Sequence, residues 1–128
     1  MKLLALVSAV FAVAAPSKTV QLAIVHTVNG CHIWQGAHAQ GAKAVLKLKQ
    51  GDKITVHVTC PMDFTLVQLK GPRLVLGDPT LHTGTQRTIR FAKRGVYVLQ
   101  ATNIQSSTEM GMQTLGPDNV LKLTVTVS

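Results

Sequence analysis

The chain has 128 residues, of which 13 are lysine or arginine and only 5 are aspartate or glutamate, so its formal net charge is +8. This length predicts one domain. The basic balance favours acidic partners and anionic surfaces. However, the basic residues are spread singly and aromatic residues make up only 4% of the chain. A protein that binds nucleic acid through stacking and a dense basic run is therefore not expected.

The N-terminal segment has the pattern of a secretory signal peptide. Lys2 provides a short basic start, an apolar run extends over residues 3–15, and small residues precede the expected cleavage after Ala14. We therefore predict a signal peptide over 1–14 and a single exported domain over 15–128, secreted or periplasmic. The alternative is an uncleaved anchor, which is the only membrane contact that the sequence predicts.

Most of the remaining chain alternates apolar and polar residues with period two, which is typical of half-buried β-strands. Gly, Pro and Asp separate these runs, as expected for turns. The predicted strands are 20–26, 45–49, 54–59, 65–70, 73–76, 87–91, 96–102 and 119–127. No helical period is sustained. The pattern predicts an all-β protein, a Greek-key β-sandwich of seven or eight strands.

A segment directly after the first predicted strand concentrates good metal ligands. It contains His26, Cys31, His32 and Trp34, the only tryptophan in the chain. Imidazole nitrogen and thiolate sulfur suit copper or zinc and suit calcium or magnesium poorly. The segment can be a metal site, half of a disulfide, or a loop that happens to contain histidine.

The arrangement of the later segments resembles the cupredoxin fold, a small copper-binding β-sandwich. Gly51-Asp-Lys-Ile-Thr-Val-His-Val is similar to one strand of that family, and Gly95-Val-Tyr97 is similar to the start of its penultimate strand. A loop with Met110 and Met112 lies where the family has its copper-binding loop, before a last strand over 120–127. The Cys-His-x-Trp segment is also similar to one found in cupredoxin-like domains.

The chain departs from the family at its usual copper ligands. Blue copper sites use one thiolate, two histidines and usually a weak methionine. The resemblance places the thiolate at Ala101 and the first histidine within Cys60–Phe64, and neither residue type is found at its position. No histidine occurs over 102–108 for the second position. Only Met110 or Met112 remains at a family ligand position.

We therefore predict a non-standard copper site at the pole where the first strand of a cupredoxin ends. Thiolate, thioether and imidazole donors together favour copper over hard ions. The candidate metal ligands are His26, Cys31, His32, Met62, Met110 and Met112. The resulting expectation is an exported copper-binding protein that acts in electron transfer or copper handling, with an acidic redox or copper-donor protein as its partner.

The sequence does not predict an enzyme. It contains no Gly-x-Ser-x-Gly elbow, no phosphate loop and no His-Glu-x-x-His pattern, and it lacks the His-x-His pairs of multicopper oxidases. The alternative to a copper protein is a metal-free sandwich with a Cys31–Cys60 disulfide, acting as a binding or structural module. Exported proteins with two cysteines usually form such a bond.

Several candidate ligands also have a plain structural interpretation. His26 lies on the apolar face of its predicted strand and can be a core histidine. His32 has the opposite strand orientation, so both can bind one metal only if the segment between them is not extended. A free Cys60 is expected to be a small buried hydrophobe. Methionines commonly fill gaps in cores, but Met62 lies next to Pro and Asp, where we expect a loop and core filling is less natural.

Overall fold

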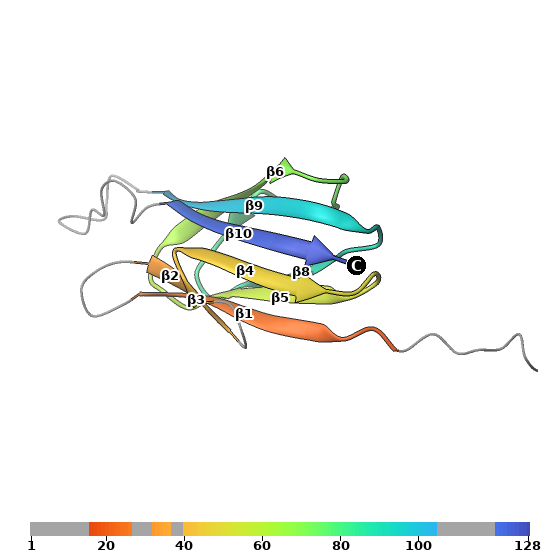
Figure 1. Ribbon diagram of the computed structural model, residues 1–128. Coiled ribbons are helices and arrows are strands. Elements are labelled where there is room, and N and C mark those ends of the chain that lie inside the picture. Colours follow the sequence, from red (N-terminus) through yellow and green to blue (C-terminus); the bar gives the residue numbers. More distant parts are fainter. Residues whose placement is uncertain (1–15, 27–31, 37–39, 105–119) are drawn as a thin grey trace, which may run out of the picture.

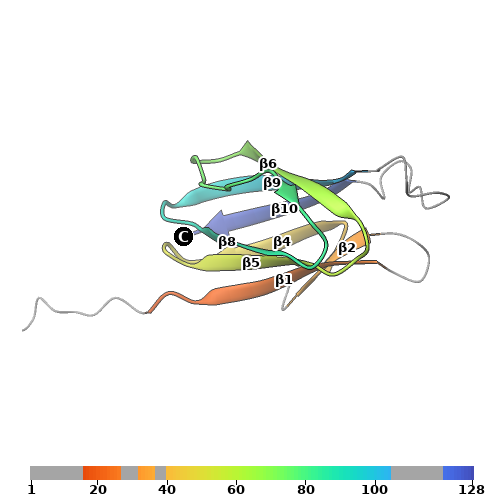
Figure 2. The ribbon, with the colours of Figure 1, turned by 180° about the vertical axis from the view of Figure 1, so that it is seen from behind.

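The computed structural model describes residues 16–26, 32–36, 40–104 and 120–128, and its regular structure is entirely β-strand. The strands form two sheets packed face to face, as Figures 1 and 2 show from opposite sides. The first sheet has the spatial order β3 (Gln40–Gly41), β2 (His32–Gly36), β1 (Thr19–His26), β5 (Lys53–Val58) and β8 (Gln86–Arg90). The second has the order β4 (Lys43–Leu48), β10 (Val120–Val127), β9 (Gly95–Ile104), β6 (Asp63–Lys70) and β7 (Thr80–Leu81).

This architecture confirms the predicted all-β sandwich. Both sheets are mixed, because β1 pairs in parallel with β5 and β10 pairs in parallel with β4, while the other neighbours are antiparallel. Among the described residues there is no helix long and apolar enough to span a membrane. The predicted signal peptide over 1–14 lies outside these residues and stays a prediction.

The strands differ from the prediction in three places. The hairpin strand β2 and the short strands β3 and β7 were not predicted. Conversely, the predicted strand over 73–76 is irregular, because a side chain rather than a neighbouring strand bonds its backbone. The Gln68 amide donates to Pro72 O at 2.7 Å and accepts from Leu74 N at 2.9 Å. The segment therefore passes alongside β6 without joining a sheet.

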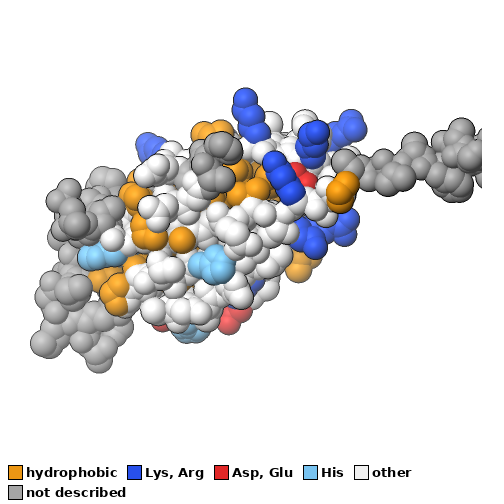
Figure 3. Space-filling view, turned by 90° about the horizontal axis from the view of Figure 1, so that it is seen from below, with side chains coloured by type: hydrophobic (Ala, Val, Ile, Leu, Met, Phe, Trp, Pro, Cys, Tyr) orange, Lys and Arg blue, Asp and Glu red, His pale blue; other side chains and the backbone are white. Residues whose placement is uncertain are grey.

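The strand registers define two ends of the sandwich. At one end the start of β1 pairs with the start of β5, which pairs with the end of β8. We call this the basic end, because Lys18, Lys53 and Arg90 lie there, and Figure 3 shows lysine and arginine gathered toward the point where the chain enters β1. At the opposite end β1 finishes and β2 begins, with His26 opposite His32, and we call this the histidine end.

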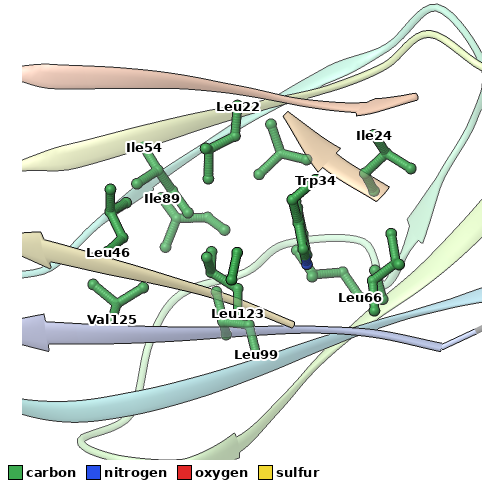
Figure 4. Close-up of a cluster of buried hydrophobic side chains, with 14 of the residues drawn as sticks. Leu22, Ile24, Trp34, Leu46, Ile54, Leu66, Ile89, Leu99, Leu123 and Val125 are labelled. Carbon is green, nitrogen blue, oxygen red and sulfur yellow. The ribbon is translucent and has the colours of Figure 1, made fainter. Parts of the chain in front are cut away.

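The core lies between the two sheets and accounts for the period-two pattern of the sequence. The inward side chains of β4, β9 and β10 are buried while their neighbours are half-buried or exposed. Figure 4 shows Trp34 in the space between the sheets, with Ile24 near the first sheet and Leu66 near the second. The largest fully buried side chains are Trp34, Tyr97, Phe64 and Phe91. Truncating one such aromatic to alanine costs about 3–5 kcal/mol.

Candidate functional site

His26 and His32 meet side by side at the histidine end. They are the terminal pair of the antiparallel β1–β2 hairpin, in direct register. Directly opposed residues of an antiparallel pair project to the same face of the sheet. Their ring centroids lie 5.0 Å apart with an interplanar angle of 47°. The condition for a shared site is thus met, because the chain reverses direction between the two histidines.

The two imidazoles have different surroundings. The His32 side chain is 0% exposed, and its ring meets the Phe64 ring edge-on with centroids 5.2 Å apart. His26 is exposed, which corrects the interpretation of it as a core histidine. His26 is the last residue of β1. The pair therefore joins the core to solvent through two adjacent rings.

Met62 is buried in the core rather than placed in an open loop. It is 3% exposed, because it continues the inward alternation of Phe64 and Leu66. Its Sδ accepts a hydrogen bond from Asn103 Nδ2 at 2.9 Å. Asn103 is the register partner of Phe64 on β9. The expectation that Met62 is poorly suited to core filling is therefore wrong, while its role as a metal ligand stays a prediction.

Asn103 is a buried polar residue that the sequence analysis did not single out. It is 8% exposed, and among the described residues its Oδ1 has no hydrogen-bond partner. A buried amide oxygen without a partner costs about 1–3 kcal/mol. Its only sequence signal is an asparagine at an inward position of β9, two residues after Ala101. Asn103 places an amide oxygen at the histidine end, close to the point where β9 leads into the segment 105–119.

Cys60 has a free thiol that is buried at the same end of the sandwich, 2% exposed. Its Sγ donates to Met62 O at 3.7 Å. Burial raises the pKa of the Cys60 thiol, an effect larger than the opposing backbone hydrogen bonds of Met62 and Cys60. A neutral, shielded thiol behaves as a small hydrophobe, as expected for a free Cys60. It is poorly prepared to act as a thiolate ligand.

The other sulfur candidates lie outside the described residues. These are Cys31 in the segment 27–31 and Met110 and Met112 in the segment 105–119. The residues flanking these segments lie at the histidine end, since Thr102 pairs with Val120 and Ile104 pairs with Asp63. The chain therefore attaches both sulfur-bearing segments close to the histidine pair.

The described residues do not fit a standard blue copper site. Ala101, at the family position of the thiolate, is 0% exposed on β9 and offers no donor. Nowhere in 16–26, 32–36, 40–104 and 120–128 do three or more His, Cys, Asp or Glu side chains cluster as a metal site would require. The histidine pair supplies two imidazole donors, which suit copper or zinc. A complete site needs further donors from the segments on either side.

An ion pair that sequence reasoning missed lies beside Met62. His82 Nδ1 is 2.9 Å from Asp63 Oδ2, and Thr83 N donates to Asp63 Oδ1 at 3.1 Å. The hydrogen bond from His82 is the main cause of the lowered pKa of Asp63. His82 is exposed but paired. Nineteen residues separate the two in sequence, so no local pattern could show the contact.

The fold has counterparts among solved structures, although the sequence has no close relative in the other comparisons. A purple cupredoxin from Nitrosopumilus maritimus aligns with a TM-score of 0.50 and 18% identity, over 84% of this chain and 98% of that one. The inclusion body protein PixA from Burkholderia cenocepacia aligns with a TM-score of 0.57 and 12% identity, over 91% and 99%. No family model matches the chain, and the search of curated proteins finds no match.

These likenesses define the class as a cupredoxin-like β-sandwich. Because the sequence identities are 18% and 12%, these likenesses show only that the strands are arranged in a similar way. They carry no ligand set from one protein to the other, since function depends on the site and not on the fold. The predicted cupredoxin-like fold is confirmed at this level.

Proposed function

We propose that the protein is an exported cupredoxin-like copper-binding protein that acts in electron transfer or copper handling rather than as an enzyme. The observation that carries the proposal is the histidine pair. Two imidazoles from adjacent strands converge to 5.0 Å between ring centroids, at the end of the sandwich where both sulfur-bearing segments attach. A bound copper would supply either a one-electron redox centre or a cargo for delivery.

The proposed ligands have distinct tasks. His26 provides an exposed nitrogen through which copper can be reached, and His32 provides a nitrogen held in place by the edge of Phe64. Cys31 directly precedes His32 in sequence, and Met110 or Met112 supplies a soft thioether from the other segment. Met62 takes part only if its sulfur gives up the hydrogen bond from Asn103.

The proposal is tested by adding Cu(I) and Cu(II) to the purified protein, with metal analysis after gel filtration. Trp34 gives a second readout, because it is the only tryptophan and lies two residues from His32 on the same face of β2. Same-face neighbours on a strand are roughly 7 Å apart, close enough for copper to quench the indole fluorescence. We expect about one copper per chain, with quenching that saturates at that ratio.

His26→Ala is the informative variant, since this side chain is exposed and its loss leaves the core intact. We expect copper affinity to fall by at least roughly tenfold, because even outer-shell partners of ligands are worth about 10–100-fold. His57→Ala is the matched control, as His57 lies on β5 and pairs with Gln21. A protein that retains no copper, or equal losses in the two variants, would contradict the proposal.

A second candidate is the metal-free sandwich with a Cys31–Cys60 disulfide, acting as a binding module through its basic surface. The gathering of lysine and arginine at the basic end favours it, and the free Cys60 thiol argues against the bond. Thiol titration of the unfolded, unreduced protein, prepared without air, separates the two. If two thiols are titrated, the disulfide is excluded. If no thiol is titrated, a Cys31 thiolate ligand is excluded.

A further inference from the structure

A groove opens along one side of the sandwich, where β1 and β4 face each other from different sheets. Its volume is about 650 Å³. The residues lining it are Lys18, Thr19, Val20, Gln21, Val45, Leu46 and Lys47. Figure 3 shows lysine and arginine side chains around apolar surface near the point where the chain enters β1. The groove lies away from the histidine pair and is independent of the proposed function.

Among the described residues, both walls of the groove are strand edges without a neighbouring strand. β4 is the last strand of its sheet, and β1 pairs with the described part of β2 from Leu22 onward. On the side of β4 that faces β10, Ala42 O accepts a hydrogen bond from Lys122 N and Leu48 O accepts one from Ser128 N. Successive residues of a strand direct their backbone groups to opposite sides. The N–H and C=O groups of Lys43, Val45 and Lys47 therefore point to the open edge. Such an edge is a template for pairing with another strand.

The charge around the groove selects among the possible occupants. Lys18 and Lys47 flank it, Lys43 continues the same edge, and no acidic residue lines it. Edge lysines oppose pairing between two copies of the same edge, because like charges would then meet. The same lysines attract a strand of opposite charge. Val45 is 57% exposed beside them, which leaves an apolar contact available.

We propose that this groove binds an extended acidic segment of a partner protein, which adds as a strand to the open edge of β4. Its backbone pairs with that of Val45, its apolar side chains contact Val20 and Leu46, and its carboxylates face Lys18 and Lys47. This is strand addition, in which the main chain provides affinity and alternate side chains provide specificity. The interaction surface thus lies on the side of the sandwich, and not at its histidine end.

The probe is a synthetic eight-residue peptide that alternates valine and aspartate, labelled for fluorescence anisotropy. The matched peptide alternates valine and lysine. We expect the acidic peptide to bind and the basic one not to bind. In NMR spectra of the purified protein, the largest amide shifts should fall on residues 19–21 and 43–47. Binding of both peptides, or shifts elsewhere, would overturn the proposal.

Val45→Pro tests the strand pairing itself. Proline removes the outward N–H of residue 45 and leaves the β10 side of β4 intact, as is tolerated on edge strands. We expect binding of the acidic peptide to be lost. The double change Lys18→Glu with Lys47→Glu keeps every backbone group and should weaken binding by roughly tenfold, since exposed pairs contribute modestly. Lys70→Glu, on the opposite side of the second sheet, should leave binding within about twofold.

These variants separate the alternatives. Full binding by Val45→Pro would show capture by charge without strand addition, and would overturn the proposal. A dimer in light scattering that Val45→Pro dissociates would make a second copy the occupant, and would overturn it as well. If Val45→Pro fails to fold, the lysine reversals and the amide shifts still decide, because both act on exposed groups.

Discussion

Asp52 is a buried carboxylate that ties three segments together at the basic end. Its Oδ2 accepts from Lys49 N at 2.8 Å and its Oδ1 accepts from Lys18 N at 3.0 Å. Its backbone oxygen also accepts a hydrogen bond from Phe91 N at 2.9 Å. The N–H of Lys49 is the main cause of the lowered pKa of Asp52, and it outweighs the opposing effect of burial. The residue was predicted only as a turn former.

The lowered pKa of Asp52 predicts a loss of stability in acid. Because the folded pKa lies below the ordinary value of 3.8, the unfolded chain binds the proton more tightly. The stabilisation is therefore complete above about pH 4 and disappears as pH falls through the folded pKa. Asp52→Asn should lower the free energy of unfolding at pH 7 by about 1–3 kcal/mol, since an amide cannot accept both N–H groups.

Urea unfolding at pH 7 and at pH 3 measures this effect. The difference between the wild type and Asp52→Asn should shrink at the lower pH. Asp78→Asn is the control, because Asp78 accepts a single bond, from Thr80 N, at an exposed turn. It should change stability by less than about 0.5 kcal/mol. A difference between wild type and Asp52→Asn that is independent of pH would contradict the electrostatic account.

Some residue roles were readable from the sequence and others were not. The imidazole and thiol donors of the His26–Trp34 segment could be identified from the sequence, because residue type is local information. The burial of His32 was not readable, because a histidine in an alternating run looks polar whichever face it occupies. The burial of Met62 was also missed, since Pro and Asp beside it suggested a loop.

The β1–β2 hairpin is the element on which the histidine pair depends. Its second strand was missed because the segment was interpreted as a ligand-bearing loop. A signal was present, since Asn29-Gly30 between two apolar runs is a strong short-range indication of a hairpin. By contrast, β5, β9 and β10 were predicted close to their observed bounds, because apolar and polar residues alternate regularly in their sequences.

Gly36 fixes how closely the end of β2 approaches β1. A Cβ at this position would lie 2.6 Å from Gln21 O and 2.6 Å from Leu22 Cδ2. The backbone oxygen cannot move without disturbing β1, so Gly36→Ala should strain the hairpin. We expect a loss of about 1–3 kcal/mol in the free energy of unfolding, as for other overpacked sites. If the copper proposal holds, affinity should fall too, because His32 lies on the same strand.

Gly41→Ala is the control for this prediction, in the neighbouring strand β3. Gly41 has a φ of 103° but no atom within 4 Å of an added Cβ, so alanine meets only backbone strain. That strain costs about 1–2 kcal/mol. Denaturant unfolding gives the stabilities, and the copper titration gives the affinities. Unchanged stability in Gly36→Ala would contradict the role of this contact, and equal losses of copper affinity would contradict its link to the histidine pair.

For the whole molecule, folding gathers charges that are scattered along the chain. In the sequence the basic residues are spread singly. The registers instead bring many of them to the basic end. They are Lys18, Lys47, Lys49, Lys53, Lys70, Arg90, Lys93 and Arg94. The acidic Asp52 among them is already bonded to backbone N–H groups. Topology, which alternation alone does not fix, therefore creates the charge asymmetry.

This asymmetry predicts that the basic end dominates binding to anionic surfaces. Arg90→Glu with Arg94→Glu alters two charges at the basic end, while Lys43→Glu with Lys122→Glu alters two that face each other on β4 and β10. Each substitution of a basic residue by glutamate lowers the net charge by two, so each double variant moves the formal net charge from +8 to +4. Charges clustered within a Debye length of about 8–10 Å act together, whereas separated ones are screened from each other. We expect the first variant to elute from a cation exchanger at distinctly lower salt than the second. Equal elution would show that net charge alone governs binding, and that the basic end directs no partner.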